Sequence, residues 1–366
     1  TPFTKEAYEL EKEKMRLHTR DGVEEVRGKT LSFWNTTPVP HLHGKKYEDV
    51  TGDYIGNAKR VRDSFHVYDA EECRYCAFLY MNIKDAYDYS SWGMEASRIY
   101  DSQNVGQKAY NVLFSSQTYD NVMDVRYSHH CLNSSNLFGC VGIRKNEYCI
   151  LNKRYTKDEY ETLVSRIIQH MNDMPYSDSC GRRYQYGEYV PPEHSMFAYN
   201  ESVACDFFPK TREEVTRFGM RWRDADVRNL TPTMKQAEIP ADIREVNDSV
   251  KNELIECTYA DSGRPQCTKI FKIIKQELEF YKNLDIPLPA ICPQCRQTDR
   301  LGRHNPFRLW SRQCQCGGER SVSGVYANSA PHDHGTSRCS VQFKTSYFPD
   351  RPEIVYCEKC YRSEVV

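Results

Sequence analysis

Long apolar runs, net charge and familiar catalytic motifs are all missing from this chain of 366 residues. No stretch approaches the roughly 18 consecutive apolar residues that a membrane-spanning helix needs, and Thr1-Pro-Phe-Thr4 resembles neither a signal peptide nor an anchor. The formal net charge is −1, so no overall field draws the protein to nucleic acid or acidic lipid. The chain has no phosphate-binding glycine loop, dinucleotide fingerprint, His-Glu-x-x-His motif or nucleophile elbow. These absences favour a soluble cytoplasmic protein, without a membrane partner and without an assignable enzymatic activity.

The composition is that of a globular protein with many cysteines and tyrosines. Hydrophobic residues make up 39%, and there are 26 tyrosines and 16 cysteines. Disulfide frameworks belong mainly to small secreted domains, whereas Cys-x-x-Cys pairs in a long chain without a signal peptide favour reduced thiols and metal. The length predicts two or three domains.

Residues 1–60 are polar and are predicted to form a peripheral or capping segment. The charged stretch from Lys5 to Arg20 is compatible with a helix. Pro38 and Pro40 interrupt regular structure beyond it, because proline lacks a backbone donor.

Residues 61–155 are predicted to form a parallel β-solenoid, a β-helix-like fold of stacked coils. The region is rich in Tyr, Asn, Ser, Asp and Cys and shows no helical period. Lys84-Asp-Ala-Tyr-Asp88 is echoed by Lys108-Ala-Tyr-Asn111, and Val112-Leu-Phe114 by Asn136-Leu-Phe138. A period of about 23 or 24 residues with polar turns is typical of a solenoid. An irregular antiparallel sheet is the alternative.

Residues 156–250 are predicted to be a helical connector that begins with an amphipathic helix. Thr156-Lys-Asp-Glu159 is a capping box, and apolar residues then recur on one face as far as Met171. We expect this helix, over residues 156–172, to cap the solenoid, because an uncovered terminal coil would leave an unpaired edge.

The remaining helices are predicted from caps and proline positions. Thr211-Arg-Glu-Glu214 is a second capping box, whose helix ends near Gly219. The stretch from Pro232 to Pro240 is interpreted as a linker, and a helix is expected around residues 241–255. Lys275 to Leu284 is predicted to be a third amphipathic helix.

Residues 251–366 are predicted to be a tandem zinc-binding region of zinc-ribbon or treble-clef-like type. Cys292-Pro-Gln-Cys295 and Cys357-Glu-Lys-Cys360 are knuckles, tight turns that aim two thiolates at one ion. Cys257 and Cys267 are the nearest upstream partners of the first knuckle. Four thiolates leave no open coordination position, so the ions are predicted to be structural.

The second site is ambiguous from spacing alone. Its favoured ligands are four cysteines: Cys314, Cys339, Cys357 and Cys360. Cys314 and Cys316 lie too close in sequence for a usual knuckle, so Cys316 is the first alternative. His332 and His334 lie on the intervening loop and could also substitute. The prediction is therefore two Zn²⁺ ions, with one ligand left open.

A basic and aromatic segment lies between the knuckles and contains five arginines, one phenylalanine and one tryptophan. We call it the arginine–aromatic strip, and its residues are Arg296, Arg300, Arg303, Phe307, Arg308, Trp310 and Arg312. Arginine binds phosphate in a bidentate manner, and aromatic rings stack on unpaired bases. The strip is the predicted nucleic-acid surface. A solvated basic strand of a zinc ribbon is the alternative.

Five further cysteines match no ribbon spacing, and we expect them to pack as small hydrophobic residues or to pair in space: Cys73, Cys76, Cys131, Cys140 and Cys149. His129-His130-Cys131 suggests a Cys/His nucleophilic pair, but no third orienting group is evident. His41 and His43 are a weak metal signal.

Several longer motifs lie within residues 50–366: Cys73-Arg-Tyr-Cys76, Ser135-Asn-Leu-Phe-Gly-Cys-Val-Gly142, Tyr148-Cys-Ile-Leu-Asn-Lys153, Phe197-Ala-Tyr-Asn-Glu201, Gln276-Glu-Leu-Glu-Phe-Tyr281 and Pro349-Asp-Arg-Pro-Glu-Ile-Val-Tyr-Cys-Glu-Lys-Cys360. With them, the chain resembles an uncharacterised family of cysteine-rich zinc-ribbon proteins from uncultured candidate-phylum bacteria with small genomes. Members of that family carry Cys-x-x-Cys-Gly where this chain has Cys314 and then a long insertion. The resemblance therefore supports Cys339 as a ligand, and it implies no activity.

Three functions are hypotheses at this point. The first is a non-enzymatic, zinc-stabilised protein that binds RNA or a ribonucleoprotein through the arginine–aromatic strip. The second is a structural scaffold in which the solenoid self-associates or binds a protein partner. The third is a polysaccharide-active β-helix enzyme, for which the candidate carboxylates are Asp85, Asp88, Asp101 and Asp124.

Overall fold

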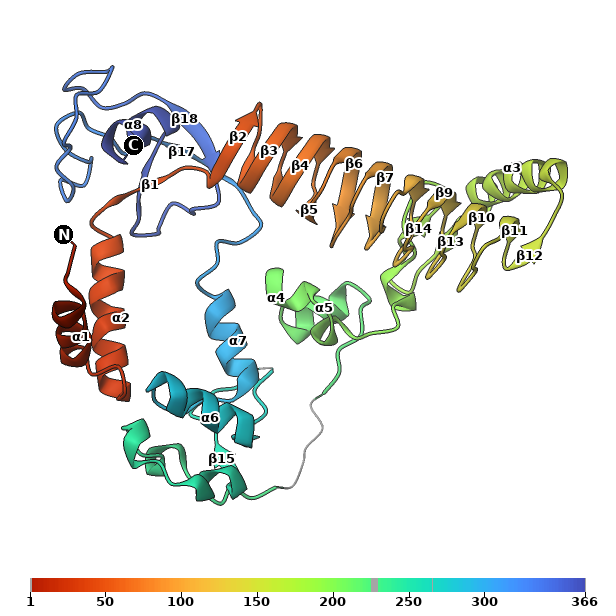
Figure 1. Cartoon of the computed structure of the whole chain (residues 1–366). Helices are drawn as coiled ribbons and strands as arrows, with labels where there is room; N and C mark the ends of the chain where they lie inside the picture. The colour runs from red at the N-terminus through yellow and green to blue at the C-terminus, as the bar shows by residue number, and fades with distance from the viewer. Residues whose placement is uncertain (1, 225–229, 265, 366) are drawn as a thin grey trace. The chain divides into compact units, whose positions relative to one another are not determined.

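The computed structural model describes residues 2–224, 230–264 and 266–365. The chain divides into two compact units, each built from segments distant in sequence. The helical unit comprises Thr1–Thr37 and Arg223–Asn305, and the solenoid unit comprises Pro38–Trp222 and Pro306–Val366. Helices and strands are both present (Figure 1), which confirms the mixed α+β fold class.

The helical unit contains four α-helices and one small hairpin among its described residues. Its elements are α1 (Lys5–Lys14), α2 (Arg20–Trp34), β15 (Ile255–Glu256), β16 (Ile270–Phe271), α6 (Lys275–Leu284) and α7 (Pro293–Leu301). The core gathers apolar side chains around the first knuckle, among them Ile255, Ile273 and Leu278. Helix α6 has the predicted bounds, whereas α2 was not predicted.

The prediction of a helix around residues 241–255 is wrong. The chain forms two short 3₁₀ turns there, Ile243–Glu245 and Asp248–Asn252, and then strand β15. The side chains of Asp242 and Asn247 each accept a backbone N–H two residues later. Such local bonds offer the backbone an alternative to the helical pattern.

The solenoid unit is dominated by one parallel sheet whose strands stack coil on coil (Figure 1). Its strands are β2 (Gly44–Glu48), β3 (Gly52–Arg62), β4 (Ser64–Arg74), β5 (Ala77–Leu79), β6 (Ile83–Ser90), β7 (Ala96–Gln103), β8 (Tyr110–Leu113), β9 (Val122–Arg126), β10 (Ser134–Phe138), β11 (Glu147–Ile150) and, antiparallel at the end, β12 (Lys153–Arg154). The β-solenoid is confirmed, and its first strand lies upstream of the predicted start at residue 61.

One coil is about half as long as the predicted repeat. Gly52 pairs with Ser64, twelve residues later, and Ala86 pairs with Ile99, thirteen residues later. The predicted period of about 24 therefore spans two coils. The predicted alignment of the repeats was also shifted by one residue, because it matched Phe114 to Phe138. In the structure Leu113 and Phe138 both pair with Arg126, so Leu113 is the residue equivalent to Phe138.

Inward-facing side chains recur every third residue in this sheet. In one coil the inward-facing, buried side chains are Ile55, Ala58, Val61 and Ser64. A coil of twelve thus has four sides of three residues. The longer coils carry one four-residue side, as between Leu79 and Ile83, where Met81 and Asn82 both have positive φ.

The residue before each inward position usually has a positive φ, which turns the chain at the corner. Examples are Asn57 (φ 47°), Asp69 (52°) and Asp85 (51°). Asn and Asp enter this left-handed region more readily than other non-glycine residues, and β-branched residues are strongly disfavoured there. None of the described positive-φ residues is Val, Ile or Thr. This conformation accounts for the Asn- and Asp-rich composition of the region.

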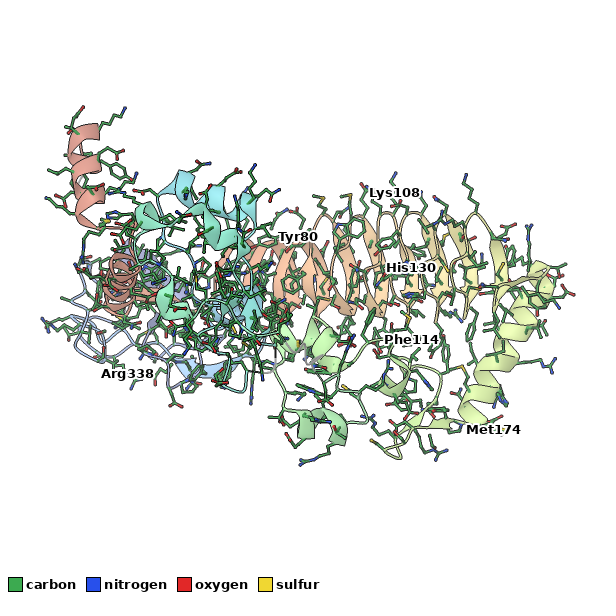
Figure 2. The ribbon with its side chains drawn as sticks, turned by 90° about the horizontal axis from the view of Figure 1, so that it is seen from below. Tyr80, Lys108, Phe114, His130, Met174 and Arg338 are labelled. Atoms are coloured by element: carbon green, nitrogen blue, oxygen red, sulfur yellow. The ribbon has the colours of Figure 1, made fainter. Side chains whose placement is uncertain are left out.

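Further segments of the solenoid unit pack on the coils. Helix α3 (Lys157–Asp173) carries the predicted capping box, and its Tyr160 and Val164 pack with Phe138 and Ile150 of the last coils. A segment with strands β13 (Tyr176–Ser177) and β14 (Arg183–Tyr184) comes next. Its neighbour Tyr186 contacts the ring of Phe114, on the side of the coil stack opposite Lys108 (Figure 2).

The C-terminal part of the solenoid unit contains the second knuckle. Its elements are β17 (Trp310–Gln313), β18 (Gln342–Thr345), β19 (Ile354–Tyr356) and α8 (Glu358–Val365). Strands β17 and β18 form an antiparallel hairpin, and β19 pairs in parallel with β1 (Pro38–Pro40). Two short helices, α4 (Ala204–Phe207) and α5 (Arg212–Arg217), complete the unit, and α5 begins at the predicted Thr211 capping box.

Candidate metal centres and the arginine–aromatic strip

The first predicted cysteine group converges in the helical unit. Its sulfur atoms lie within 4.8 Å of one another, and they belong to Cys257, Cys267, Cys292 and Cys295. Hairpin β15–β16 presents the first two, and the turn that begins α7 presents the others. Backbone amides of Cys292 and Cys295 donate to the sulfurs of Cys257 (3.3 Å) and Cys292 (3.4 Å). Burial opposes ionisation of Cys292, but hydrogen bonds from Thr268 and the Cys295 amide lower its pKa to about 7.

The second predicted group converges in the solenoid unit. The sulfurs of its four buried cysteines again lie within 4.8 Å of one another: Cys314, Cys339, Cys357 and Cys360. Cys314 directly follows β17, and Cys357 directly precedes α8. The Cys357 amide donates to the Cys314 sulfur at 3.2 Å, and a hydrogen bond from the Cys314 thiol lowers the pKa of Cys357 to about 5. Both groups supply four soft donors around one point, which is the arrangement of a closed metal site.

A third group was not predicted as a site of its own. Cys316, His332, His334 and Cys360 also place one ligand atom each within 4.8 Å of one another. The sequence had suggested the first three only as substitutes in the second site. Three groups of residues could thus hold metal ions, and two of these groups share Cys360.

The arginine–aromatic strip is divided between the two units, since Arg296 to Asn305 belongs to the helical unit and Pro306 to Arg312 to the solenoid unit. The first half lies mainly in helix α7, not in a strand. Arg296 is turned inward, where it donates to Glu277 and Tyr281 at 2.8 Å each. Arg300 and Arg303 are exposed.

In the second half, two of the four predicted residues serve internal packing or bonding. Phe307 stacks on Phe65 at 4.8 Å and on Phe207 at 4.9 Å between ring centroids. Arg312 donates to the carbonyl oxygens of Tyr347 and Phe348. Burial lowers the pKa of Arg312, which remains a cation at neutral pH.

Arg308 and Trp310 remain on the surface of the solenoid unit. The guanidinium carbon of Arg308 lies 5.3 Å from the centroid of the Trp310 ring, a cation–π contact. The Trp310 ring lies 5.9 Å from that of Phe348, which is 37% exposed. Within the described residues no carboxylate forms an ion pair with Arg308.

The other predicted candidates lie mainly in the solenoid core. The five additional cysteines point inward, and all are buried: Cys73, Cys76, Cys131, Cys140 and Cys149. Burial raises the pKa of Cys131 to about 11, so it is a poor nucleophile. His129 instead faces outward and contacts the Ser116 hydroxyl at 2.7 Å. His41 packs on Phe343, and His43 bonds to Asp53.

The candidate carboxylates occupy two edges of the coil stack. Asp88 and Asp101 are at equivalent positions of neighbouring coils, each next to one of the register-paired residues Tyr87 and Tyr100. Burial raises the pKa of Asp88, and burial together with the charge of Asp88 raises that of Asp101. Asp85 and Asp124 are at equivalent positions of another edge, three coils apart, so the four carboxylates do not form one cluster: Asp85, Asp88, Asp101 and Asp124.

Comparison with known proteins identifies no relative: no family model matches the chain, and no curated protein or solved structure matches it significantly. The resemblance to zinc-ribbon proteins of candidate-phylum bacteria therefore stays a prediction. No helix in the described part of the chain has the length and apolar character needed to cross a membrane.

Proposed function

We propose that the protein is a non-enzymatic binding protein, stabilised by zinc, that binds single-stranded RNA through the β17–β18 hairpin. The observation that carries the proposal is the exposed Arg308 stacked on Trp310. Its charge is not neutralised by a described carboxylate, and the ring of Phe348 lies beside the pair. A cation next to a half-buried tryptophan ring and an exposed phenylalanine ring can neutralise a phosphate while bases stack.

Zinc would fix the shape of this surface. Thiolates and imidazoles are the donors that zinc prefers, and a tetrahedral arrangement at about 2.3 Å from the metal puts sulfurs about 3.8 Å apart, compatible with ligand atoms that lie within 4.8 Å of one another. Cys314 follows β17 directly, and Cys339 lies shortly before β18. Their binding to one ion would therefore close the hairpin at that end, and the binding energy would stabilise the fold.

The proposal is tested with a fluorescent 20-residue oligouridine and the full chain, by anisotropy over a series of salt concentrations. We expect Arg308→Ala/Trp310→Ala to weaken binding about 10- to 100-fold, because loss of one stacked base costs about 1–3 kcal/mol. The slope of log affinity against log salt should fall by about 0.7 for the lost phosphate contact.

The matched control is Arg300→Ala/Arg303→Ala, which removes two exposed arginines of the same strip from the helical unit. It should leave the affinity within about twofold. Zinc content should be equal in wild type and both variants. Absence of wild-type binding at low salt, or equal losses in the two double variants, would overturn the proposal.

A second candidate is a polysaccharide-binding surface on the solenoid. Tyr87 and Tyr100 pair in register on adjacent coils and are 47% and 40% exposed. Asp88 and Asp101 beside them can accept hydrogen bonds from hydroxyl groups. In a pull-down with insoluble polysaccharides, the Tyr87→Ala/Tyr100→Ala variant should no longer sediment with the polysaccharide. The control Tyr110→Ala, which removes an exposed tyrosine from another side of the coil stack, should still sediment with it. If the wild-type protein stays in the supernatant with every polysaccharide tested, this candidate function is wrong.

The scaffold alternative has less support in the geometry. Stacking of solenoids end to end requires a free coil edge, and α3 packs against the last coil as a cap would. A monomer by light scattering at high concentration would exclude self-assembly.

A further inference from the structure

The second and third ligand groups are adjacent and have one residue in common. Cys360 belongs to both, and its buried sulfur lies within 4.8 Å of six other ligand atoms. If each group binds its own ion, the Cys360 thiolate must contact both, because each cysteine offers a single sulfur. A thiolate has enough lone pairs to do so.

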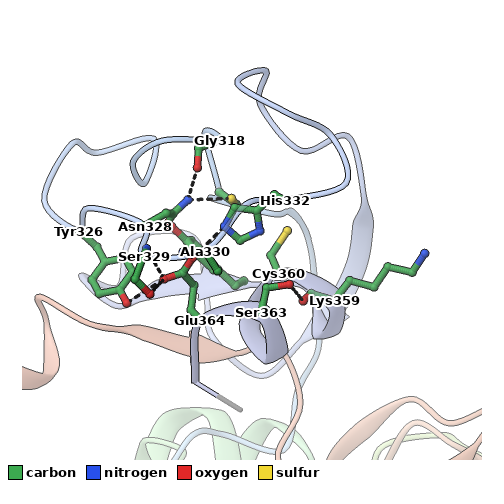
Figure 3. Close-up of polar contacts among 12 residues, drawn as sticks. Gly318, Tyr326, Asn328, Ser329, Ala330, His332, Lys359, Cys360, Ser363 and Glu364 are labelled. Atoms are coloured by element: carbon green, nitrogen blue, oxygen red, sulfur yellow. Dashed lines mark hydrogen bonds and ion pairs between the residues drawn. The ribbon is translucent and has the colours of Figure 1, made fainter.

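The two histidines of the third group have one ring nitrogen each engaged by an acceptor. Nδ1 of His334 lies 2.7 Å from the carbonyl oxygen of Ser337, so this nitrogen carries the proton. Nε2 of His334 is then unprotonated and has a lone pair that can bind a metal ion, and it lies 3.3 Å from the Cys360 sulfur. Nε2 of His332 lies 2.9 Å from a carboxylate oxygen of Glu364 (Figure 3). The lone pair of Nδ1 of His332 is then available to bind a metal ion.

Glu364 is held in place for this contact. Its side chain is fully buried, and it accepts hydrogen bonds from the Ser329 amide (2.8 Å), the Ser329 hydroxyl (2.9 Å) and the Tyr326 hydroxyl (3.0 Å). The His332 side chain is 1% exposed. A carboxylate that orients a buried histidine from behind is the usual support of a metal ligand.

The fourth donor, Cys316, is also oriented. The side-chain amide of Asn328 donates to the Cys316 sulfur at 3.2 Å. The Tyr356 hydroxyl donates to the oxygen of the same amide at 2.7 Å, which fixes the direction of its N–H groups. The amide N–H therefore holds the Cys316 sulfur in place within the group.

Charge gives a further argument. The combined cluster contains five thiol groups and two imidazoles, nearly all removed from water. The four thiolates of the second group around one divalent ion leave a charge of −2 in the interior, and adding the Cys316 thiolate together with a second divalent ion changes it to −1. Because an uncompensated buried charge is costly, two ions fit this donor set better than one.

We propose that Cys316, His332, His334 and Cys360 bind a second divalent ion of zinc type, so that the solenoid unit holds a dinuclear centre bridged by the Cys360 thiolate. With the Cys257 site, the chain then binds three ions, not the two predicted from the sequence. The proposal does not depend on RNA binding.

The first test is metal stoichiometry of the purified full chain by mass spectrometry. Wild type should carry three zinc ions, and His332→Ala/His334→Ala and Cys316→Ser should each carry two. The matched controls His170→Ala/His194→Ala and Cys180→Ser remove exposed residues of the same types outside the clusters and should keep three. Two ions in wild type, or three in the histidine variant, would overturn the proposal.

The bridge is tested without any substitution in Co²⁺-loaded wild type. Two high-spin Co²⁺ ions that share a thiolate are magnetically coupled, which suppresses their electron paramagnetic resonance signal. The integrated signal should therefore correspond to about one ion per chain, the ion of the Cys257 group, although three are bound. Three independent signals would refute the bridge, even if the stoichiometry is three. This measurement also decides the matter if a ligand variant fails to fold.

Discussion

Removal of one inward serine from the solenoid tests whether the coil-to-coil hydrogen bonds are as important as the structure indicates. Ser115 is 1% exposed, and its hydroxyl donates to the Leu113 carbonyl at 2.8 Å and accepts from the Ser128 amide at 3.1 Å. Ser102 and Ser128 repeat the pattern one coil before and after. In Ser115→Ala the Ser128 amide loses this acceptor, whereas the Leu113 carbonyl keeps a bond from the Tyr127 amide.

The expected cost is that of one buried, unsatisfied N–H, about 1–3 kcal/mol. Because the chain has two units, global unfolding is not a single transition, and local hydrogen exchange is the better assay. Exchange of the Ser128 amide and of its neighbours in β9 and β10 should become about 5- to 150-fold faster.

The matched control is Ser135→Ala, on an outward position of the same sheet. Since no described side-chain hydrogen bond is lost there, exchange should change by less than about twofold, equivalent to roughly 0.5 kcal/mol or less. Equal protection of the Ser128 amide in wild type and Ser115→Ala would refute the reasoning.

Two carboxylates should respond to pH in opposite ways. Asp53 is buried, which opposes its ionisation, but hydrogen bonds from His43 and Ser346 lower its pKa. Its stabilising effect should be present above about pH 4 and be lost as pH falls through the lowered value. At pH 7, Asp53→Ala should destabilise the surrounding solenoid coils by about 3–5 kcal/mol, measured by hydrogen exchange of their amides. Asp101 has a raised pKa through burial and the charge of Asp88. Asp101→Asn should therefore stabilise the surrounding coils slightly at pH 7, on the order of 0.5 kcal/mol, and should have no such effect below about pH 4. Faster hydrogen exchange of their amides in the variant at pH 7 would contradict this.

The parallel solenoid was predictable from the sequence, but its coil length was not. An inward residue every third position is neither the strand period of two nor the helical period of 3.6. Several inward positions also hold Ser64, Ser102 or Ser115, so hydrophobicity does not mark the period. The signal that could have revealed it is the spacing of Asn and Asp, which results from the positive φ at the corners.

The cysteine groups illustrate a different limit. Spacing identified the cysteines of two groups that converge and could hold a metal ion, because two knuckles each have two partner cysteines. The same rule assigns every donor to one ion, so it could treat Cys316, His332 and His334 only as substitutes. What separates a substitute from a ligand of another ion is the orientation of its free lone pair. That orientation depends on Ser337 and Glu364, which donor spacing does not reveal. A shared Cys360 is therefore visible only once the fold brings these partners together.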